Sequence, residues 1–219
     1  MRITAPGVVF GGPGKGFTLR GSQEGIEVRA ADVIVQGNRI VGSGQGIAAG
    51  PEATSVSIVD NVVTDTTDYG VIVLGDDAVV MRNVVESNQR IGMYVEAVGA
   101  VIADNHIVNN VTGLHLFAQG TTTIRHNVLT GNIDTAVSIS WSGTAPAGVV
   151  VTSNNFADNG ELDGSHCGIR ASGFVVNAER NYWGGAQGPG AGAADHLCGT
   201  IDAVPFLTRP VVISSQTGR

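Results

Sequence analysis

Short segments of this chain alternate hydrophobic and polar positions, and the same segment recurs at a regular interval. Val33–Ile40, Val56–Val63 and Ala78–Val85 share one order: apolar, variable, apolar, two variable positions, asparagine, variable, apolar. Alternation with a period of two is typical of β-strands, because successive side chains of a strand point to opposite faces. Looser or equal copies follow at Ala100–Ile107, Thr122–Leu129, Val149–Phe156 and Val176–Trp183. Such a repeat predicts a solenoid in which each copy stacks on the last.

Each repeat also has a second half that opens on a small residue. These residues are Gly25, Gly46, Gly70, Gly92, Gly113, Ala136 and Gly168. The aligned asparagines are Asn38, Asn61, Asn83, Asn105, Asn127, Asn154 and Asn181, which lie 23, 22, 22, 22, 27 and 27 residues apart. Both halves of the repeat therefore stay in register along the chain.

Two repeat folds compete for this pattern. The asparagine-bearing half also matches the strand of a leucine-rich repeat, but that fold follows its strand with a helical or 3₁₀ segment. Here the second half, as in Gly70–Val73, is rich in β-branched residues and shows no stripe of 3.6-residue period. We therefore predict an all-β chain that forms a single right-handed parallel β-helix of about seven coils, each of about 22 residues.

The repeat and the end of the chain together resemble the pectate-lyase-like superfamily of parallel β-helix proteins, which includes carbohydrate-binding and sugar-hydrolase-type repeats. The segment 181–207 carries Asn-Tyr-Trp-Gly at 181–184, Gly-Pro at 188–189, Asp195 and Pro-Phe-Leu at 205–207, which is similar to a closing motif common in that superfamily. We expect one domain, with an N-terminal entry at 1–20, coils at 21–182 and a C-terminal cap at 183–219. Trp183 is expected to cover the last rung of the core.

The asparagines have a physical role in such a fold. A tight turn between strands favours a residue that tolerates a left-handed backbone, and asparagine does so better than other non-glycine residues. Stacked at coil spacing, each side-chain amide can donate to one neighbouring coil and accept from the other. We expect the seven aligned asparagines to form this ladder, and a second series to form another at the next turn: Asn88, Asn110, Asn132 and Asn159.

Composition excludes several classes of function. The 219 residues carry 12 Lys and Arg against 19 Asp and Glu, which gives a net charge of -7. Only Lys15 is a lysine, and the basic residues are scattered singly, so a duplex nucleic acid is not an expected partner. No apolar run approaches the roughly 18 residues of a membrane span. Glycine is abundant because it opens strands and fills turns, and the inward apolar positions of each coil leave few places for charge.

Candidate chemistry must lie on outward positions, because the interior of a β-helix is packed with apolar side chains. The two outward positions after each small residue bring aromatic and titratable groups together on coils four to seven, although aromatic residues make up only 5% of the chain. This face carries Tyr94, Glu96, His115, Phe117, Ser138, Ser140 and Arg170, with Trp141 at the end of its strand. We expect a surface that binds polysaccharide.

The resemblance implies a chemistry for this face. Lyases and C5-epimerases of uronate polymers on this fold abstract the proton next to a carboxylate, which needs a base, a proton donor and a group that neutralises the carboxylate. The corresponding hypothesis takes His115 as base, Tyr94 as acid and Arg170 as carboxylate clamp, with the other residues of the face binding substrate. The alternative is an ordinary polar face on a non-catalytic carbohydrate-binding or structural module of a larger surface or phage-type protein. The Asp-Pro-His-Glu string of secreted alginate epimerases is absent.

Metal sites have little support in the sequence. Calcium, which many such lyases use, would need stacked carboxylates, but Asp60 and Asp104 have Arg82 between them and predict an alternating salt ladder. His106 and His126 lie near one turn on successive coils without an evident third ligand. The superfamily also includes a periplasmic protein for copper assembly of nitrous-oxide reductase. Three methionines, five scattered histidines and no Cys-x-x-Cys give copper handling little basis here.

The opposite strand predicts a partner surface. Its outward positions include an apolar strip over three coils, formed by Val59, Val79, Met81, Val101 and Ala103. An apolar strip of this kind is typical of a covered surface, so we expect a second subunit, a neighbouring domain or the irregular N-terminal segment to lie on it.

Cysteine content and the N-terminus bear on the compartment. Cys167 and Cys198 are the only two cysteines and can either form a disulfide that ties the cap to the last coil or remain a free buried pair. Met1 and Arg2 are followed by Ile-Thr-Ala-Pro, which does not have the pattern that we expect of an apolar signal region. The resemblance implies a secreted, periplasmic or cell-surface protein.

Overall fold

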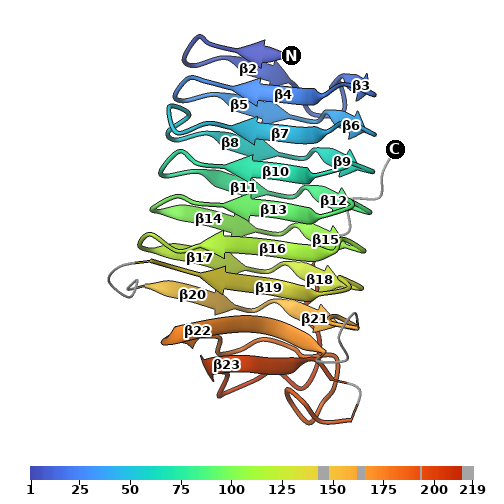
Figure 1. Cartoon of the computed structure of the whole chain (residues 1–219), viewed down its shortest axis with the longest axis vertical. Helices are drawn as coiled ribbons and strands as arrows, with labels where there is room; N and C mark the ends of the chain where they lie inside the picture. The colour runs from blue at the N-terminus through green and yellow to red at the C-terminus, as the bar shows by residue number, and fades with distance from the viewer. Residues whose placement is uncertain (143–147, 162–165, 193, 214–219) are drawn as a thin grey trace.

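The chain forms a parallel β-helix of about eight turns in which each complete coil contributes three strands (Figure 1). The structure is a computed structural model that describes residues 1–142, 148–161, 166–192 and 194–213. Within these ranges it holds 23 strands and no helix, which confirms the predicted fold class. No described segment is a helix of the length and hydrophobicity that crossing a bilayer requires.

Three stacks of parallel strands make up the solenoid. The front stack consists of β1 (Arg2–Ile3), β4 (Glu24–Val28), β7 (Gln45–Ala49), β10 (Tyr69–Val73), β13 (Ile91–Val95), β16 (Thr112–Phe117), β19 (Thr135–Ser140) and β22 (Cys167–Asn177). The second stack consists of β2 (Val9–Gly11), β5 (Ile34–Gln36), β8 (Ser57–Val59), β11 (Val79–Met81), β14 (Ala100–Ala103), β17 (Thr122–Arg125) and β20 (Val149–Thr152). The third consists of β3 (Thr18–Arg20), β6 (Arg39–Val41), β9 (Val62–Thr64), β12 (Val84–Glu86), β15 (His106–Val108), β18 (Val128–Thr130) and β21 (Asn155–Ala157). The last strand, β23 (His196–Asp202), pairs with β22.

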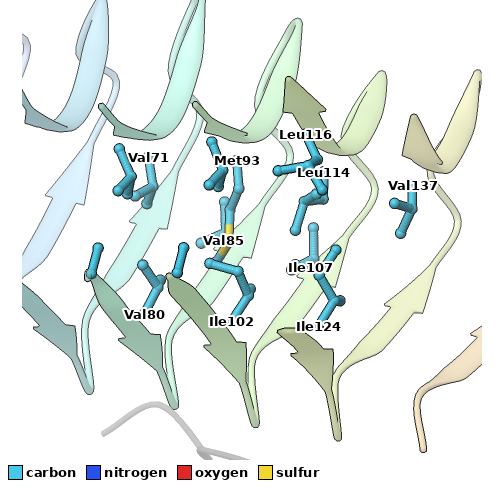
Figure 2. Close-up of a cluster of buried hydrophobic side chains, with 14 of the residues drawn as sticks. Val71, Val80, Val85, Met93, Ile102, Ile107, Leu114, Leu116, Ile124 and Val137 are labelled. Carbon is cyan, nitrogen blue, oxygen red and sulfur yellow. The ribbon is translucent and has the colours of Figure 1, made fainter. Parts of the chain in front are cut away.

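The core is a column of aliphatic side chains enclosed by the three stacks. Figure 2 shows Val71, Met93, Leu114 and Val137 from the front stack facing inward across the coils, toward residues of the other stacks such as Ile102. These five side chains have no solvent exposure. Replacing one such Leu or Ile with Ala costs about 2–5 kcal/mol of folding free energy, because the neighbours fill the cavity only in part. The interior is therefore structural, and binding chemistry is left to the outer faces.

The predicted asparagine ladder is present. The Asn83 side-chain amide donates to Oδ1 of Asn105 at 3.0 Å, and the Asn83 backbone N–H donates to the same oxygen at 2.9 Å. The pattern repeats from Asn38 to Asn181. The second predicted ladder also forms, from Asn88 to Asn159. Most of these amides also donate to a backbone carbonyl of the preceding coil, as Asn83 does to Ile58 of β8 at 2.8 Å, so carbonyls next to the bend are satisfied.

The left-handed residue of each turn lies one position before the expected one. Asp60, Arg82, Asp104 and His126 have φ values of 57°, 54°, 56° and 54°, whereas the ladder asparagines that follow them do not have positive φ. The prediction that the ladder asparagine itself adopts this conformation is therefore wrong. The preceding residue turns the chain, and this leaves the asparagine side chain inside, where its amide bonds to the neighbouring coils.

The C-terminal cap closes the core with an aromatic pair and a disulfide. Trp183 is fully buried and stacks on Phe156, with ring centroids 4.7 Å apart and planes 11° apart, so the expected role of Trp183 is confirmed. Cys167 of β22 and Cys198 of β23 form a disulfide with a Cα–Cα distance of 5.8 Å. Of the two states that the sequence left open, the structure has the bonded one.

The apolar strip of the second stack is only partly exposed. Val59 and Ala103 are buried within the chain itself, with 8% and 0% exposure. Val79, Met81 and Val101 remain at intermediate exposure. Arg82 forms an ion pair with Asp60 at 2.8 Å next to this strip, as the alternating charges predict.

Candidate functional site

The outer face of the front stack has the register that the repeat alignment predicts. Tyr94 of β13 pairs with His115 of β16, His115 with Ser138 of β19, and Ser138 with Arg170 of β22. Strands in a sheet lie about 4.8 Å apart, so Tyr94 and His115 are one rung apart and Arg170 is two rungs beyond His115. The structure thus brings the proposed acid and base together and places the proposed clamp farther along the same face. The strands that carry these residues, β13, β16, β19 and β22, follow one another along the solenoid (Figure 1).

Tyr94 is held by the carboxylate of Glu96. Its hydroxyl donates to Oε2 of Glu96 at 2.8 Å, and the side-chain amide of Gln119 donates to the other oxygen at 3.0 Å. Partial burial, and then the hydrogen bond to Glu96, raise the pKa of Tyr94 to about 12. The phenol therefore keeps its proton across the physiological range, as a proton donor must.

The pKa of His115 shifts in the opposite direction to that of Tyr94. It lies half-buried between neighbouring rungs, and this desolvation lowers the pKa of its imidazole below the ordinary value. Its Nε2 lies 2.8 Å from Oγ of Ser140, which fixes the ring orientation. The Tyr94 and His115 rings are 5.6 Å apart between centroids. His115 is thus neutral near pH 7, as a general base must be.

Arg170 is already engaged by a carboxylate of the chain. Its Nη1 lies 2.8 Å from Oδ1 of Asp134, whose other oxygen accepts a hydrogen bond from Thr112 at 3.3 Å. A carboxylate clamp at Arg170 therefore requires the guanidinium to bind the ligand and Asp134 together.

The remaining residues of the predicted face form its C-terminal end. Phe117 of β16 pairs with Ser140 of β19, and β19 pairs in turn with β22 of the last coil. The indole N–H of Trp141 donates to the backbone carbonyl of Ser172 at 2.8 Å, and the ring packs edge-on against Phe174 at 6.1 Å. Trp141 is thus fixed by the last coil at the edge of the face.

Several residues of this face were not identified from the sequence. Tyr69 lies edge-on to Tyr94 with centroids 5.8 Å apart, and the guanidinium of Arg90 lies over the Tyr69 ring at 5.3 Å. Arg90 also pairs with Asp68 at 2.9 Å. Tyr69 precedes the small residue of its repeat by one position, and Arg90, Asp68 and Asp134 precede theirs by two. Extending the alignment backwards by two positions would have found this edge.

Metal ligands do not gather in the part of the chain that the structure describes. No group of three or more His, Cys, Asp or Glu side chains there could hold an ion. Asp60 is bound to Arg82, and Nδ1 of His126 lies 3.9 Å from Asp104. His166 and His196 of the cap approach with ring centroids 6.0 Å apart. The face of Tyr94 and His115 therefore offers acid–base groups and aromatic rings as its chemistry.

Solved structures with a similar fold include periplasmic alginate epimerases. A double mutant of the epimerase AlgG superposes with a TM-score of 0.53 at 17% identity, over 86% of this chain and 49% of that one. Another structure of the epimerase AlgG superposes with a TM-score of 0.54 at 14% identity, over 88% of this chain and 43% of that one. This chain thus spans about half the length of these proteins, and the likeness establishes the fold alone. No curated protein sequence matches the chain.

A family model described as periplasmic copper-binding protein (NosD) matches residues 10–169. The described residues do not fit a copper site, because both cysteines are in the disulfide and Met93 is buried in the core. The matched segment carries the strands and ladders of most of the solenoid. Because the match extends over well more than half of its length, the chain belongs to the NosD family of β-helix proteins.

Proposed function

We propose that the chain binds a uronate-containing polysaccharide along the outer face of the front stack and cleaves it by β-elimination. The observation that carries the proposal is the adjacent pair of His115 and Tyr94. Burial lowers the pKa of the imidazole, while burial and Glu96 raise the pKa of the phenol to about 12. Two neighbouring groups with pKa values driven apart are the mark of an assigned base and acid.

The step balances with these two groups. The imidazole of His115 takes the C5 proton of the uronate, and the electron pair of the broken C–H bond forms the C4–C5 double bond. The C4–O4 bond breaks, and the phenol of Tyr94 transfers its proton to O4 as it leaves. The hydroxyl of Tyr94, which donates to Glu96 in the resting protein, turns to O4 for this transfer. Glu96 disfavours a lasting phenolate, so the phenolate takes up a proton from solvent, and the imidazolium of His115 releases the C5 proton to solvent. The products are a shortened chain and an unsaturated uronate.

The spacing of the two rings favours a lyase over an epimerase. Epimerisation needs groups on opposite faces of the sugar, with the pyranose between them. A ring in contact with both side chains would need about 7–8 Å, twice the 3.5–4.0 Å of a van der Waals contact. The Tyr94 and His115 centroids are 5.6 Å apart, so both groups approach a sugar from one side.

Approach from one side also selects the sugar. Elimination by a base and an acid on the same side requires that the C5 hydrogen and O4 lie on the same side of the pyranose. This holds for mannuronate and glucuronate, whereas the two groups lie on opposite sides in guluronate and galacturonate. We therefore propose polymers of the first two uronates as substrates, with Arg170, supported by Asp134, next to the carboxylate.

We place the protein in the periplasm or outside the cell. The matching family is one of periplasmic proteins, and the structurally similar epimerases are periplasmic as well. The disulfide between Cys167 and Cys198 fits an oxidising compartment.

The test is a panel of four polymers: mannuronate-rich, guluronate-rich, galacturonate and glucuronate-containing. Ultraviolet absorbance reports unsaturated products, and deuterium incorporation at C5 reports epimerisation. We expect absorbance to rise with the mannuronate or glucuronate polymer and to be lost in His115→Ala. Silence of both measurements with every polymer would refute the catalytic proposal.

The second candidate function is binding without catalysis, as a module of a larger surface or phage-type protein. The engagement of Arg170 by Asp134 favours it, because a clamp already occupied by a carboxylate weakens substrate activation. In this case Val79, Met81 and Val101 would contact another subunit or domain. Val79→Asp and Val101→Asp would then change the oligomeric state in sedimentation, and an unchanged state would argue against that contact.

A further inference from the structure

A hollow lies on the same outer face, toward the N-terminal end of the solenoid. It has a volume of about 240 Å³ and opens over β4, β7 and β10. Its lining includes Glu24, Arg29, Gln45, Ala48, Ile72 and Leu74. Ala48 pairs with Ile72, which pairs with Tyr94, so the floor of the hollow at Ala48 lies about 10 Å, or two rungs, from the proposed acid.

The hollow exists because one outward position of β7, Ala48, and the residue that follows the strand, Gly50, are small. Ala48 is in register with Glu27 on one side and with Ile72 and then Tyr94 on the other. The side chains at all of these neighbouring positions are large, and Ala48 is the exception. Gly50 leaves a similar gap one outward position further on, and a Cβ there would lie 2.7 Å from a carboxylate oxygen of Glu52. Large neighbours on both sides thus form walls around a low floor.

The charges around the hollow are already paired. Glu27 is 5% exposed, and its carboxylate accepts from Arg29 at 2.6 Å and from Arg2. These hydrogen bonds, that of Arg29 first, lower the pKa of the Glu27 carboxyl. Arg29 also approaches Glu52 at 3.4 Å. Its guanidinium is therefore shared by two carboxylates, and a third carboxylate, that of Glu24, lines the hollow. A ligand that carries a carboxylate would therefore find no unpaired positive charge among these side chains and would be repelled by Glu24.

The remaining chemistry fits a neutral sugar. Ile72 and Leu74 offer an apolar wall to the C–H face of a pyranose, while Gln45, Glu24 and Arg29 offer planar polar groups to its hydroxyls. We propose that this hollow is a subsite for an uncharged sugar residue. The substrate is then a heteropolysaccharide, in which a neutral sugar binds here while a uronate of the same strand lies at Tyr94 and His115. The placement of the uronate at Tyr94 and His115 rests on the proposed function, whereas the neutral-sugar subsite itself does not.

The test uses neutral oligosaccharides alone, so that it does not depend on the uronate site. Gluco-, galacto- and manno-oligosaccharides are titrated into the protein, and binding is followed by calorimetry and amide chemical shifts. Ala48→Phe fills the hollow from an outward position, and Ser57→Phe, outward on β8 of the second stack, is its matched control. We expect at least one oligosaccharide to bind wild type, Ser57→Phe and His115→Ala equally, and Ala48→Phe at least about tenfold more weakly.

The outcomes separate the two proposals. Equal affinity of Ala48→Phe and wild type, or no binding of any neutral oligosaccharide, overturns the subsite even if a uronate polymer is cleaved. Binding that is lost in Ala48→Phe supports the subsite even if no uronate polymer is cleaved, and the catalytic proposal alone then fails. Where both hold, Ala48→Phe should raise KM for a glucuronate–hexose copolymer, whereas Ser57→Phe on the second stack should leave that KM unchanged.

Discussion

Asn159 donates its backbone N–H to one carboxylate oxygen of Asp195 at 3.1 Å and its side-chain amide to the other at 2.6 Å. A ladder otherwise built of amides therefore ends on a carboxylate, which is 1% exposed. Burial raises the pKa of Asp195 to about 6, although the bonds from Asn159 oppose the shift. The cap thus contains an acid that takes up its proton at a higher pH than an ordinary aspartate does.

Asp195→Asn should remove a pH dependence of stability. The folded pKa of about 6 lies above the ordinary aspartate value of 3.8, so the folded chain holds this proton after the unfolded chain has lost it. Stability from this group is present below pH 4 and is lost as the pH rises to about 6, which amounts to about 1–3 kcal/mol. The neutral amide continues the ladder and should unfold at higher urea at pH 7.5, with little difference at pH 4.

The control for this measurement is Asp65→Asn, which removes the same charge at an exposed turn position that does not act on Asp195. Urea midpoints of the three proteins between pH 4 and 8 check the prediction. A difference between Asp195→Asn and wild type that does not change over this range would contradict it.

Asn105→Ala should destabilise the chain by about 3–5 kcal/mol. The substitution removes the acceptor of two hydrogen bonds from Asn83 and the donor to the carbonyl of Val80, all at buried positions. Asn109→Gly, an exposed asparagine with φ of 56°, should change stability by less than about 1 kcal/mol. Equilibrium unfolding followed by circular dichroism compares the two, and equal losses would show that the ladder contributes no more than an ordinary turn.

The sequence predicts the register of this fold because the repeat itself encodes it. Aligning asparagines and small residues places Tyr94, His115, Ser138 and Arg170 on successive rungs, and the strand pairing confirms this. Each position is set by the backbone, whose period is fixed by the ladders and the core. Counting residues from the aligned asparagines is therefore enough to predict which side chains lie on successive rungs.

What the sequence does not predict are the contacts that depend on side-chain direction. Arg170 turns toward Asp134, and Tyr94 toward Glu96, because rotamers and local charge decide among several partners within reach. The hollow at Ala48 depends in turn on the size of the walls on both sides. The sequence also does not predict the left-handed residue before each ladder asparagine, because this position is Asp, Arg, His or Ser in different coils.

Glu96→Gln should lower the pKa of Tyr94 from about 12 toward the ordinary value of 10. The carboxylate accepts the phenolic hydrogen bond and repels the phenolate, and the substitution removes its charge while desolvation remains. Ultraviolet titration of tyrosinate between pH 9 and 13 measures the shift for one of the three tyrosines. Glu86→Gln, on the third stack, removes the same charge elsewhere and should leave the titration unchanged.

Loss of the disulfide should loosen the cap. The bond closes a loop with a sequence separation of 31, for which the chain-entropy model gives about 3–4 kcal/mol. The Cys167→Ser/Cys198→Ser double variant should therefore unfold at lower urea, and wild type in a reductant should match it. Hydrogen exchange should rise first in β23, whose pairing with β22 the bond supports. Uniform exchange along the solenoid would argue that the cap and coils unfold as one unit.

His115 should give the cleavage reaction its acid limb. Because burial lowers the pKa of the imidazole, the base stays neutral to a pH below the ordinary histidine value of 6.5, and kcat/KM should fall only below that value. Ser140→Ala removes the partner 2.8 Å from Nε2 and should lower kcat more than it raises KM, because ring orientation matters most in the transition state. His115→Ala should abolish cleavage, and His126→Ala, a histidine on a turn of the same solenoid, should leave it intact. A profile whose acid limb persists in His115→Gln would assign the base to another group of the face, with Glu96 as the next candidate because its carboxylate already contacts Tyr94.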